Sequence, residues 1–154
     1  MRSIRSTSLI EVTWPPILSS DVDASSWSAV AVDGDERICL VRHTYRDGWF
    51  LPGGSVKTGE SLVEAMSREL KEETGIELPE TPQRVHGVYS SFHEHKSDHI
   101  VVFVVRDWAV TTSSSPEIAE VGFFSPDDLP AGTSAATTRR IKEFVTGVPP
   151  GHRW

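Results

Sequence analysis

The sequence has almost none of the features that fix a protein covalently or in a membrane. Its only cysteine, Cys39, excludes a disulfide within one chain, and the apolar run Ile38–Val41 around it indicates a small core residue. A chain without disulfides suits the reducing cytoplasm. The N-terminal stretch MRSIRSTSLIEVTW contains no apolar run long enough for a signal peptide or a membrane span. We therefore expect a cytoplasmic protein with no membrane partner.

Positive charge is also scarce. Lysine and arginine together number 15 against 22 aspartate and glutamate residues, which gives a net charge of −7 and a pI of about 5.3. This balance argues against stable binding of nucleic acid, whose recognition needs a basic surface. It leaves a small nucleotide substrate open, because a bound metal ion can reverse the sign of the local field.

The length and composition predict one domain with its own core. A chain of 154 residues with 38% hydrophobic and 24% charged residues is ordinary for a globular protein. We therefore assign residues 1–154 to a single domain. Within it, residues 1–26 are interpreted as an N-terminal extension or edge strand, and residues 149–154 as an irregular tail.

Apolar and β-branched segments predict strands on either side of two helices. Ser28–Val32 and Ile38–Arg42 flank the turn residues Asp33-Gly34-Asp35, which predicts a β-hairpin. Ile100–Trp108 is the most apolar run and indicates a central strand buried on both faces. The remaining predictions are strands at 84–92 and 121–124 and a helix at 133–145, on which Arg139 and Arg140 are interpreted as surface charges.

The densest chemical pattern lies in Gly54–Ile76, GSVKTGESLVEAMSRELKEETGI. Good helix formers without an internal glycine or proline predict a helix over Ser61–Thr74, ended by Gly75. At about 100° per residue, Glu69 and Glu73 project from the same face as the apolar residues of this helix. The helix is therefore expected to turn carboxylates inward rather than to water.

These inward carboxylates need a positive partner. Like charges four residues apart on a helix repel each other, and partial burial increases the cost. A bound cation removes the conflict, and oxygen ligands without Cys or His on the same face suit Mg²⁺ or Mn²⁺. Arg68, which adjoins the cluster, can orient one carboxylate by a forked hydrogen bond.

The spacing within this segment is more specific than its composition. The fixed positions, separated by five, seven, one and one residues, are Gly54, Glu60, Arg68-Glu69-Leu70, Glu72-Glu73 and Gly75-Ile76. The pattern resembles the signature of the Nudix hydrolase family (MutT-like), and the preceding Trp49–Gly54 resembles the lead-in of that family. The resemblance implies the α/β class with the Nudix α/β/α sandwich, in which a mixed β-sheet lies between helices.

The resemblance also implies a reaction, the Mg²⁺-dependent hydrolysis of a pyrophosphate bond in a nucleoside diphosphate derivative. An NTP, a nucleotide sugar, ADP-ribose and a dinucleoside polyphosphate all belong to this class, with Mn²⁺ as a substitute metal. Water attacks at phosphorus, and the metal neutralises the pyrophosphate and activates the water. The metal ligands carried over from the family are Glu69, Glu72, Glu73 and the carbonyl of Gly54.

Further acids receive supporting roles by the same resemblance. Glu60 is expected to hold the loop to the helix through Arg68. In this family a carboxylate outside the signature often acts as a ligand or general base. Glu117 and Glu120 are the candidates, with a slight preference for Glu117, and a solvated loop acid is an equal alternative for either one.

Four residues near the signature are candidates for substrate binding. Arg42 and Arg46 could bind a phosphate, and Trp49 could stack on a base or equally belong to the core. Gly53 lets the backbone approach the phosphates. Outside this region, a polar stretch contains possible zinc ligands, namely His93, His95, Asp98 and His99. A zinc site needs ligands that converge on one point. The sequence there is typical of a turn, so we interpret the stretch as a solvated loop.

Two other functions use the same features. A Nudix-like domain can sense a nucleotide without cleaving it, but the acids that such sensors lose are intact here. An enzyme similar to isopentenyl-diphosphate isomerase needs a catalytic cysteine, and Cys39 in its apolar run makes a poor acid. The expected partner is a small nucleotide-type substrate, and a homodimer is a state that many members of the family adopt.

Overall fold

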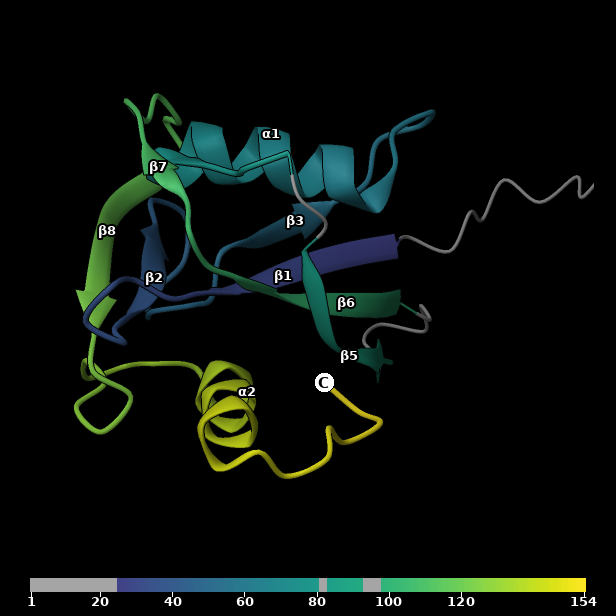
Figure 1. The fold of residues 1–154 in the computed structure, drawn as a ribbon, viewed down its shortest axis with the longest axis vertical. Helices are drawn as coiled ribbons and strands as arrows, with labels where there is room; N and C mark the ends of the chain where they lie inside the picture. The colour runs from purple at the N-terminus through teal and green to yellow at the C-terminus, as the bar shows by residue number, and fades with distance from the viewer. Residues whose placement is uncertain (1–24, 81–82, 93–97) are drawn as a thin grey trace, which may run out of the picture.

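The computed structural model describes residues 25–80, 83–92 and 98–154, and it is a mixed α/β domain (Figure 1). Its main sheet has four strands in the order β3-β1-β6-β5. They are β1 (Ser25–Ala31), β3 (Gly53–Ser55), β5 (Arg84–Ser91) and β6 (Asp98–Val105). β1 and β6 run parallel, whereas β3 and β5 pair antiparallel at the two edges. The expected mixed sheet is therefore confirmed, and β6 is one of its two interior strands.

Two smaller antiparallel sheets complete the strands. One pairs β2 (Ile38–His43) with β8 (Ile118–Phe124), and the other pairs β4 (Ile76–Glu77) with β7 (Ala109–Val110). The predicted hairpin of β1 and β2 is wrong. The turn forms, with the Asp33 amide bonded to the Arg37 carbonyl at 3.0 Å, but beyond it only a single bridge joins the two segments. Each strand finds its partners far away in the sequence instead.

Helix α1 (Leu62–Thr74) has the predicted extent because its end signals are local. Ser61 caps the first turn, and the Glu64 side chain reaches back to the Ser61 amide, so both halves of a capping box are present. Gly75 ends the helix in the left-handed conformation, with φ of 74°. Helix α2 (Ala135–Thr146) is capped by Ser134 and ends at Gly147 in the same way.

The core lies in two layers, one on each face of the main sheet. Trp27, Ala29 and Ala31 of β1 pack against α1, whereas Val30 of β1 and the following Val32 belong to the layer that contains Ile141 of α2. Figure 1 shows α1 on one side of the sheet and α2 on the other. This is the sandwich that the sequence predicts.

The bounds of the elements differ from the predictions where a local residue intervenes. β6 begins at Asp98 and ends at Val105, and Asp107 then adopts a positive φ of 56°, which an extended strand cannot continue. Ser25 and Ser26 belong to β1, whereas they were assigned to the N-terminal extension. The rest of the predicted N-terminal extension or edge strand, residues 1–24, lies outside the described residues. None of the helices in the described part of the chain is long and apolar enough to cross a membrane.

The segment 149–154 is bound to the body of the domain. Arg140, predicted to be a surface charge, is 1% exposed. Its guanidinium bonds both carboxylate oxygens of Glu143 and the Arg153 carbonyl, so the tail itself covers it. The helical pattern of α2 alone could not reveal this burial, because the covering residues come from elsewhere in the chain.

Candidate active site

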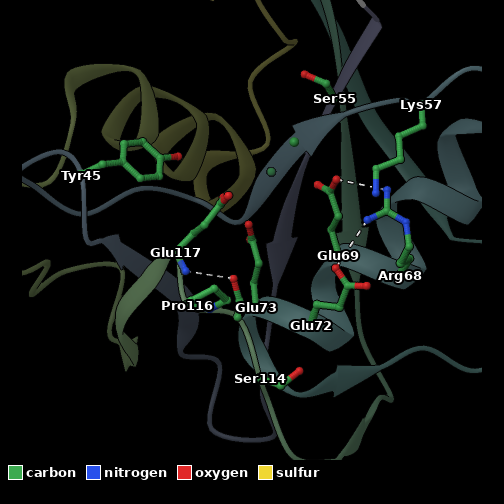
Figure 2. Close-up of a pocket in the computed structure, with 13 residues that line it drawn as sticks. Tyr45, Ser55, Lys57, Arg68, Glu69, Glu72, Glu73, Ser114, Pro116 and Glu117 are labelled. Atoms are coloured by element: carbon green, nitrogen blue, oxygen red, sulfur yellow. Dashed lines mark hydrogen bonds and ion pairs between the residues drawn. The ribbon is translucent and has the colours of Figure 1, made fainter.

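The inward carboxylates of α1 border a cavity of about 500 Å³. The three acids Glu69, Glu72 and Glu73 come from the helix, Gly53 and Gly54 come from β3, and Glu117 comes from the segment before β8. Figure 2 shows the carboxylates of Glu73 and Glu117 pointing into the same space. Residues that are 44 positions or more apart in the sequence thus meet around one cavity.

The contact between Gly54 and Glu69 explains why a glycine stands at this position. A Cβ built on Gly54 would collide with the Glu69 carboxylate. The acid therefore packs directly on the backbone of β3, which any larger residue would prevent. Gly53 is similarly close to the neighbouring strand, since a Cβ there would lie 2.7 Å from the Trp27 carbonyl oxygen. Both glycines let β3 approach its surroundings more closely than a side chain allows.

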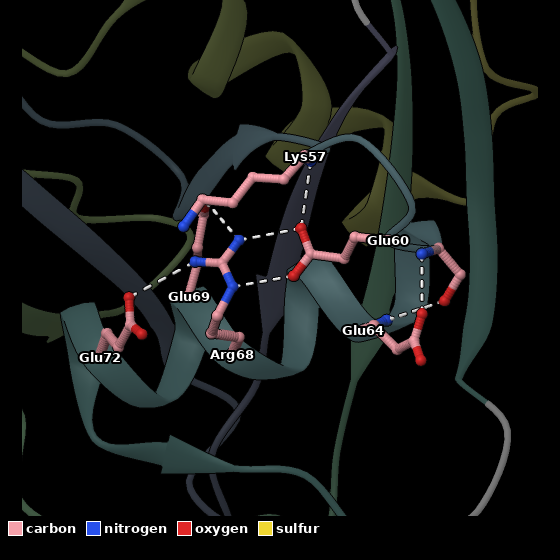
Figure 3. A network of polar contacts seen from close by, with 7 residues as sticks. Lys57, Glu60, Glu64, Arg68, Glu69 and Glu72 are labelled. Atoms are coloured by element: carbon pink, nitrogen blue, oxygen red, sulfur yellow. Dashed lines mark hydrogen bonds and ion pairs between the residues drawn. The ribbon is translucent and has the colours of Figure 1, made fainter.

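Arg68 organises the acids around it (Figure 3). Its Nε and Nη2 donate to the two oxygens of Glu60 at 2.8 and 3.0 Å, and Nη2 also donates to Glu69 Oε1 at 3.2 Å. The hydrogen bonds from Arg68 hold the pKa of Glu60 at about 2, well below its usual range. The Lys57 amide donates to the same carboxylate at 3.1 Å. Glu60 therefore joins the loop to the helix through Arg68, in the geometry expected from the sequence.

Glu73 is the least satisfied acid of the group. Its Oε2 is buried and, within the described residues, has no hydrogen-bond partner. Burial, followed by the charges of Glu69, Glu117 and Glu72, raises the pKa of Glu73 to about 7. Burial likewise raises the pKa of Glu69, although Arg68 opposes that shift. A buried acid surrounded by like charges favours either a proton or a cation.

The donor set fits a hard divalent cation, although the ligands are not yet gathered around a common point. All the candidate ligands are oxygens, which is the preference of Mg²⁺ and Mn²⁺. Among residues 25–80, 83–92 and 98–154, no three acidic, His or Cys side chains already stand at metal-ligand geometry. Glu69 and Glu72 are instead turned toward Arg68, at 3.2 and 3.5 Å. The Glu72 side chain is 53% exposed.

The two candidates for the extra acid are separated by the start of β8. Glu117 precedes the strand and lines the cavity. Its backbone is fixed by the Thr44 amide, which donates to the Glu117 carbonyl at 2.8 Å. Glu120 lies within β8 and forms an ion pair of 2.7 Å with Arg42 on the facing strand, and it does not line the cavity. The structure therefore brings Glu117, but not Glu120, to the α1 acids.

A second cavity, of about 430 Å³, adjoins the first and shares Gly53, Gly54 and Ser55 with it. Arg46 lines this second cavity, where its guanidinium lies 3.7 Å from the centre of the Phe50 ring. Asp98 and Trp154 also line this cavity, and neither is among the substrate-binding residues predicted from the sequence. Asp98 belongs to the polar stretch that leads into β6, and no local pattern marks Trp154.

Arg42 and Trp49, the other substrate-binding candidates, line neither cavity. Trp49 is 9% exposed and packs edge-to-face on Phe124 in the core, with ring centroids 4.9 Å apart. Arg42 covers that indole, with its guanidinium carbon 5.9 Å from the ring centroid. The packing of Trp49 matches a core position rather than a base-stacking position.

The polar stretch that suggested zinc is only partly described. His93 and His95 lie outside the described residues. Asp98 and His99 belong to β6, so the strand begins inside the segment predicted to be a turn. His99 Nδ1 lies 3.2 Å from Ser90 Oγ on the adjacent strand, and Asp98 accepts from Ser26 Oγ at 2.9 Å.

Comparison with known proteins places this geometry in context. Residues 23–145 match the family described as the NUDIX domain. The chain is 35% identical over 111 residues to the ADP-ribose pyrophosphatase of Methanocaldococcus jannaschii, which covers 66% of this chain and 64% of that protein. It is 52% identical over 46 residues to the RNA pyrophosphohydrolase of Xanthomonas campestris, covering 30% of this chain and 22% of that protein.

These two alignments thus span less than two thirds of each relative. Among solved structures, the MutT NUDIX hydrolase from Burkholderia pseudomallei superposes with a TM-score of 0.66 at 25% identity. That superposition covers 77% of this chain and 95% of the other. The similarity therefore extends over most of the chain and well beyond the signature.

Proposed function

The chain belongs to the NUDIX family, and from that premise we propose that it hydrolyses a pyrophosphate bond in a nucleoside diphosphate derivative with the help of Mg²⁺. One observation carries the proposal: the half-buried Glu73, whose buried Oε2 has no partner in the described residues, lies among further acids that line a cavity. An unpaired buried carboxylate is costly to the fold. A site that binds a divalent cation turns this cost into binding energy.

Each residue of the cavity receives a role from its contacts. Glu69, Glu72 and Glu73 would hold the metal, together with the Gly54 carbonyl, and Mn²⁺ is an alternative ion. When bound, the metal neutralises charge on the pyrophosphate and lowers the pKa of a water. Arg68 fixes the orientation of Glu69 through its 3.2 Å contact, and Glu60 in turn fixes Arg68. These partners keep the ligands oriented before substrate arrives.

Glu117 is our candidate for the group that takes the proton from the attacking water. It lines the cavity from the segment before β8, and its charge is one of the causes of the raised pKa of Glu73. Its backbone is fixed by hydrogen bonds, whereas its carboxylate forms no hydrogen bond or ion pair among the described residues. A general base needs this combination of a fixed position and an available oxygen.

The second cavity provides room for the organic group beyond the pyrophosphate. Gly53, Gly54 and Ser55 border both cavities, so one elongated substrate can occupy the two together. Arg46 supplies positive charge in the second cavity. Its charge lowers the pKa of Glu73 and so opposes the effect of burial and of the neighbouring acids. Because the archaeal relative is an ADP-ribose pyrophosphatase, ADP-ribose is the first substrate to test.

The isomerase alternative finds no support at Cys39. This thiol is fully buried in β2, and burial raises its pKa to about 12. It cannot reach the cavity or donate a proton readily at neutral pH. A sensing module without catalysis would have no use for an intact set of acids around the cavity.

A substrate panel tests the proposal. The purified protein is incubated with and without Mg²⁺ in the presence of ADP-ribose, sugar nucleotides, NTPs or dinucleoside polyphosphates, and products are separated by ion-exchange chromatography. We expect Mg²⁺-dependent release of a nucleoside monophosphate from at least one class. Tight binding of nucleotide with Mg²⁺ and no cleavage of any member would overturn the proposal in favour of the sensing module.

A further inference from the structure

We propose that Trp154 determines which organic group the second cavity accepts, by stacking on a nucleobase, and that the bound segment 149–154 holds this indole in the cavity wall. The inference rests on the proposed function in one respect, that the substrate is a nucleotide derivative. It concerns a residue outside the signature and on the opposite face of the sheet from α1.

The tail is held in place by the backbone of β5. The Ser90 amide donates to the His152 carbonyl at 2.9 Å, and the Trp154 amide donates to the Ser90 carbonyl at 3.1 Å. These bonds continue the sheet beyond its edge strand for one residue, Arg153, which forms a parallel bridge with Ser90. Trp154 therefore has a defined position relative to β5 and β6.

A buried ionic network fixes the same segment from the other side. Arg140 and Glu143 form two hydrogen bonds of 2.8 and 2.9 Å, and Tyr89 donates to Glu143 at 2.8 Å. The remaining Arg140 nitrogen donates to the Arg153 carbonyl at 3.0 Å, and the Gly151 amide donates to Glu143 at 3.3 Å. Burying an ion pair is expensive unless every group is satisfied. Here the tail backbone completes the set.

The indole itself is positioned by ring contacts. Trp154 meets Tyr89 edge-to-face, with centroids 5.9 Å apart and an interplanar angle of 74°. The Arg140 guanidinium lies 4.0 Å from the Tyr89 ring centre and 5.6 Å from that of Trp154. Trp154 nevertheless remains partly exposed and lines the second cavity. An anchored indole with an accessible surface is preorganised for stacking, because little freedom is left to lose on binding.

The chemistry of the rest of the cavity favours a nucleobase over a plain sugar. Phe50 and the planar guanidinium of Arg46 offer further stacking surfaces, and Arg139 contributes a second guanidinium. Asp98 supplies hydrogen-bond acceptors: Ser26 donates to its Oδ2, whereas Oδ1 has no partner among the described residues. A base combines a flat π face with N–H donors at its edge. A sugar has hydroxyl donors but no π face.

Equilibrium binding of reaction products tests the inference without requiring catalysis. Each of AMP, GMP, CMP and UMP, and ribose 5-phosphate as the base-free probe, is titrated into the protein with Mg²⁺ by isothermal calorimetry. For Trp154→Ala we expect about 5- to 150-fold weaker binding of the tightest nucleotide, the range that loss of one stacking contact produces. Binding of ribose 5-phosphate should be unchanged, and Trp154→Phe should restore most of the nucleotide affinity.

Arg153→Ala is the matched control, because it alters the neighbouring tail residue but keeps its backbone carbonyl for Arg140. The Arg153 side chain lies over Phe92, at 5.6 Å, and does not line the cavity. Equal weakening of all probes by Trp154→Ala, equal effects of Arg153→Ala, or no preference of the wild type for a nucleotide over ribose 5-phosphate would each overturn the inference. A failure of hydrolysis in the substrate panel would leave these binding results readable, so the two proposals fail separately.

Discussion

The two helices both turn charged residues inward, and they treat them in opposite ways. On α2, Arg140 and Glu143 satisfy each other, and Tyr89 and the tail satisfy what remains. On α1, Glu73 keeps an unpaired buried oxygen, and like charges surround it. Both arrangements bury ionisable atoms, the Arg140 guanidinium on α2 and Glu73 Oε2 on α1. The one on α1 is left incomplete.

The difference separates a structural use of buried charge from a functional one. A complete network such as that of Arg140 contributes to a defined packing and offers nothing to a ligand. An incomplete one destabilises the free protein and leaves free energy that a cation can recover on binding. Exposure alone does not make this distinction, because Arg140 is more buried than any acid of the α1 cluster. What decides is whether each donor and acceptor has a partner.

Removing the incomplete charge should have the largest effect on activity. We expect Glu73→Gln to lower kcat/KM for the best substrate by roughly 10³-fold, because the variant loses the charge of a proposed metal ligand that would act on the transition state. Initial rates at saturating Mg²⁺ measure the effect. Near-wild-type rates would show that Glu73 is not a ligand.

Glu64→Gln is the matched control for this variant. It makes the same chemical change on the same helix, but Glu64 is exposed and serves the capping box, which glutamine can also form. Its rate should stay close to that of the wild type. A loss as large as that of Glu73→Gln would mean that general charge on α1, rather than a ligand, matters.

Breaking the complete network should instead affect stability. Glu143→Gln leaves the Arg140 guanidinium buried without its counter-charge, and we expect a loss of about 3 kcal/mol in the free energy of unfolding. Urea denaturation measures it, with Lys142→Gln, an exposed neighbour on the same helix, as the control. The kcat of the folded variant should change little. A loss in kcat comparable to that of Glu73→Gln, without loss of stability, would erase the contrast between the helices.

The smallest expected effect is a gain in stability of Glu73→Gln over the wild type at high pH. Because the pKa of Glu73 is raised to about 7 in the folded protein, its neutral form stabilises the fold, and this contribution is lost as the pH rises from about 4.5 through 7. In the metal-free protein, Glu73→Gln should therefore match the wild type near pH 5. At pH 8 it should be more stable, by on the order of 1–2 kcal/mol.

Urea denaturation in EDTA at the two pH values measures this gain. Saturating Mg²⁺ at pH 8 should stabilise the wild type and leave the variant almost unaffected, because only the wild type recovers energy by binding. Equal stability of the two proteins at both pH values would show that Glu73 is not strained by its surroundings.

The sequence predicted best what depends on neighbouring residues. The extent of α1 follows from Ser61 and Gly75, and the contact of Arg68 with Glu60 joins residues only eight positions apart. The inward direction of Glu73 follows from helical periodicity alone. These features need no knowledge of the rest of the chain, so a pattern in one segment is enough to infer them.

Contacts between distant segments escaped prediction for the same reason. The turn between β1 and β2 was recognised, but β1 pairs with β6, which lies some 70 residues away. Arg140 was predicted to be exposed, but Tyr89 and the tail cover it. Tyr89 lies more than 50 positions away, so the sequence of α2 does not reveal the contact. The sequence could not decide whether Glu117 or Glu120 reaches the cavity. The answer depends on where β8 begins and on the ion pair between Arg42 and Glu120.

The bound tail also bears on how molecules of this protein meet one another. β5 is an edge strand of the main sheet, and it carries Val85 and Val88 exposed to solvent. Open edges of this kind invite strand pairing between molecules and hence aggregation. A register shift between Val85 and Gly87 interrupts one part of this edge, and the tail occupies both backbone groups of Ser90 in another. By covering part of the β5 edge, the segment 149–154 also reduces the backbone available for edge-to-edge association of two molecules.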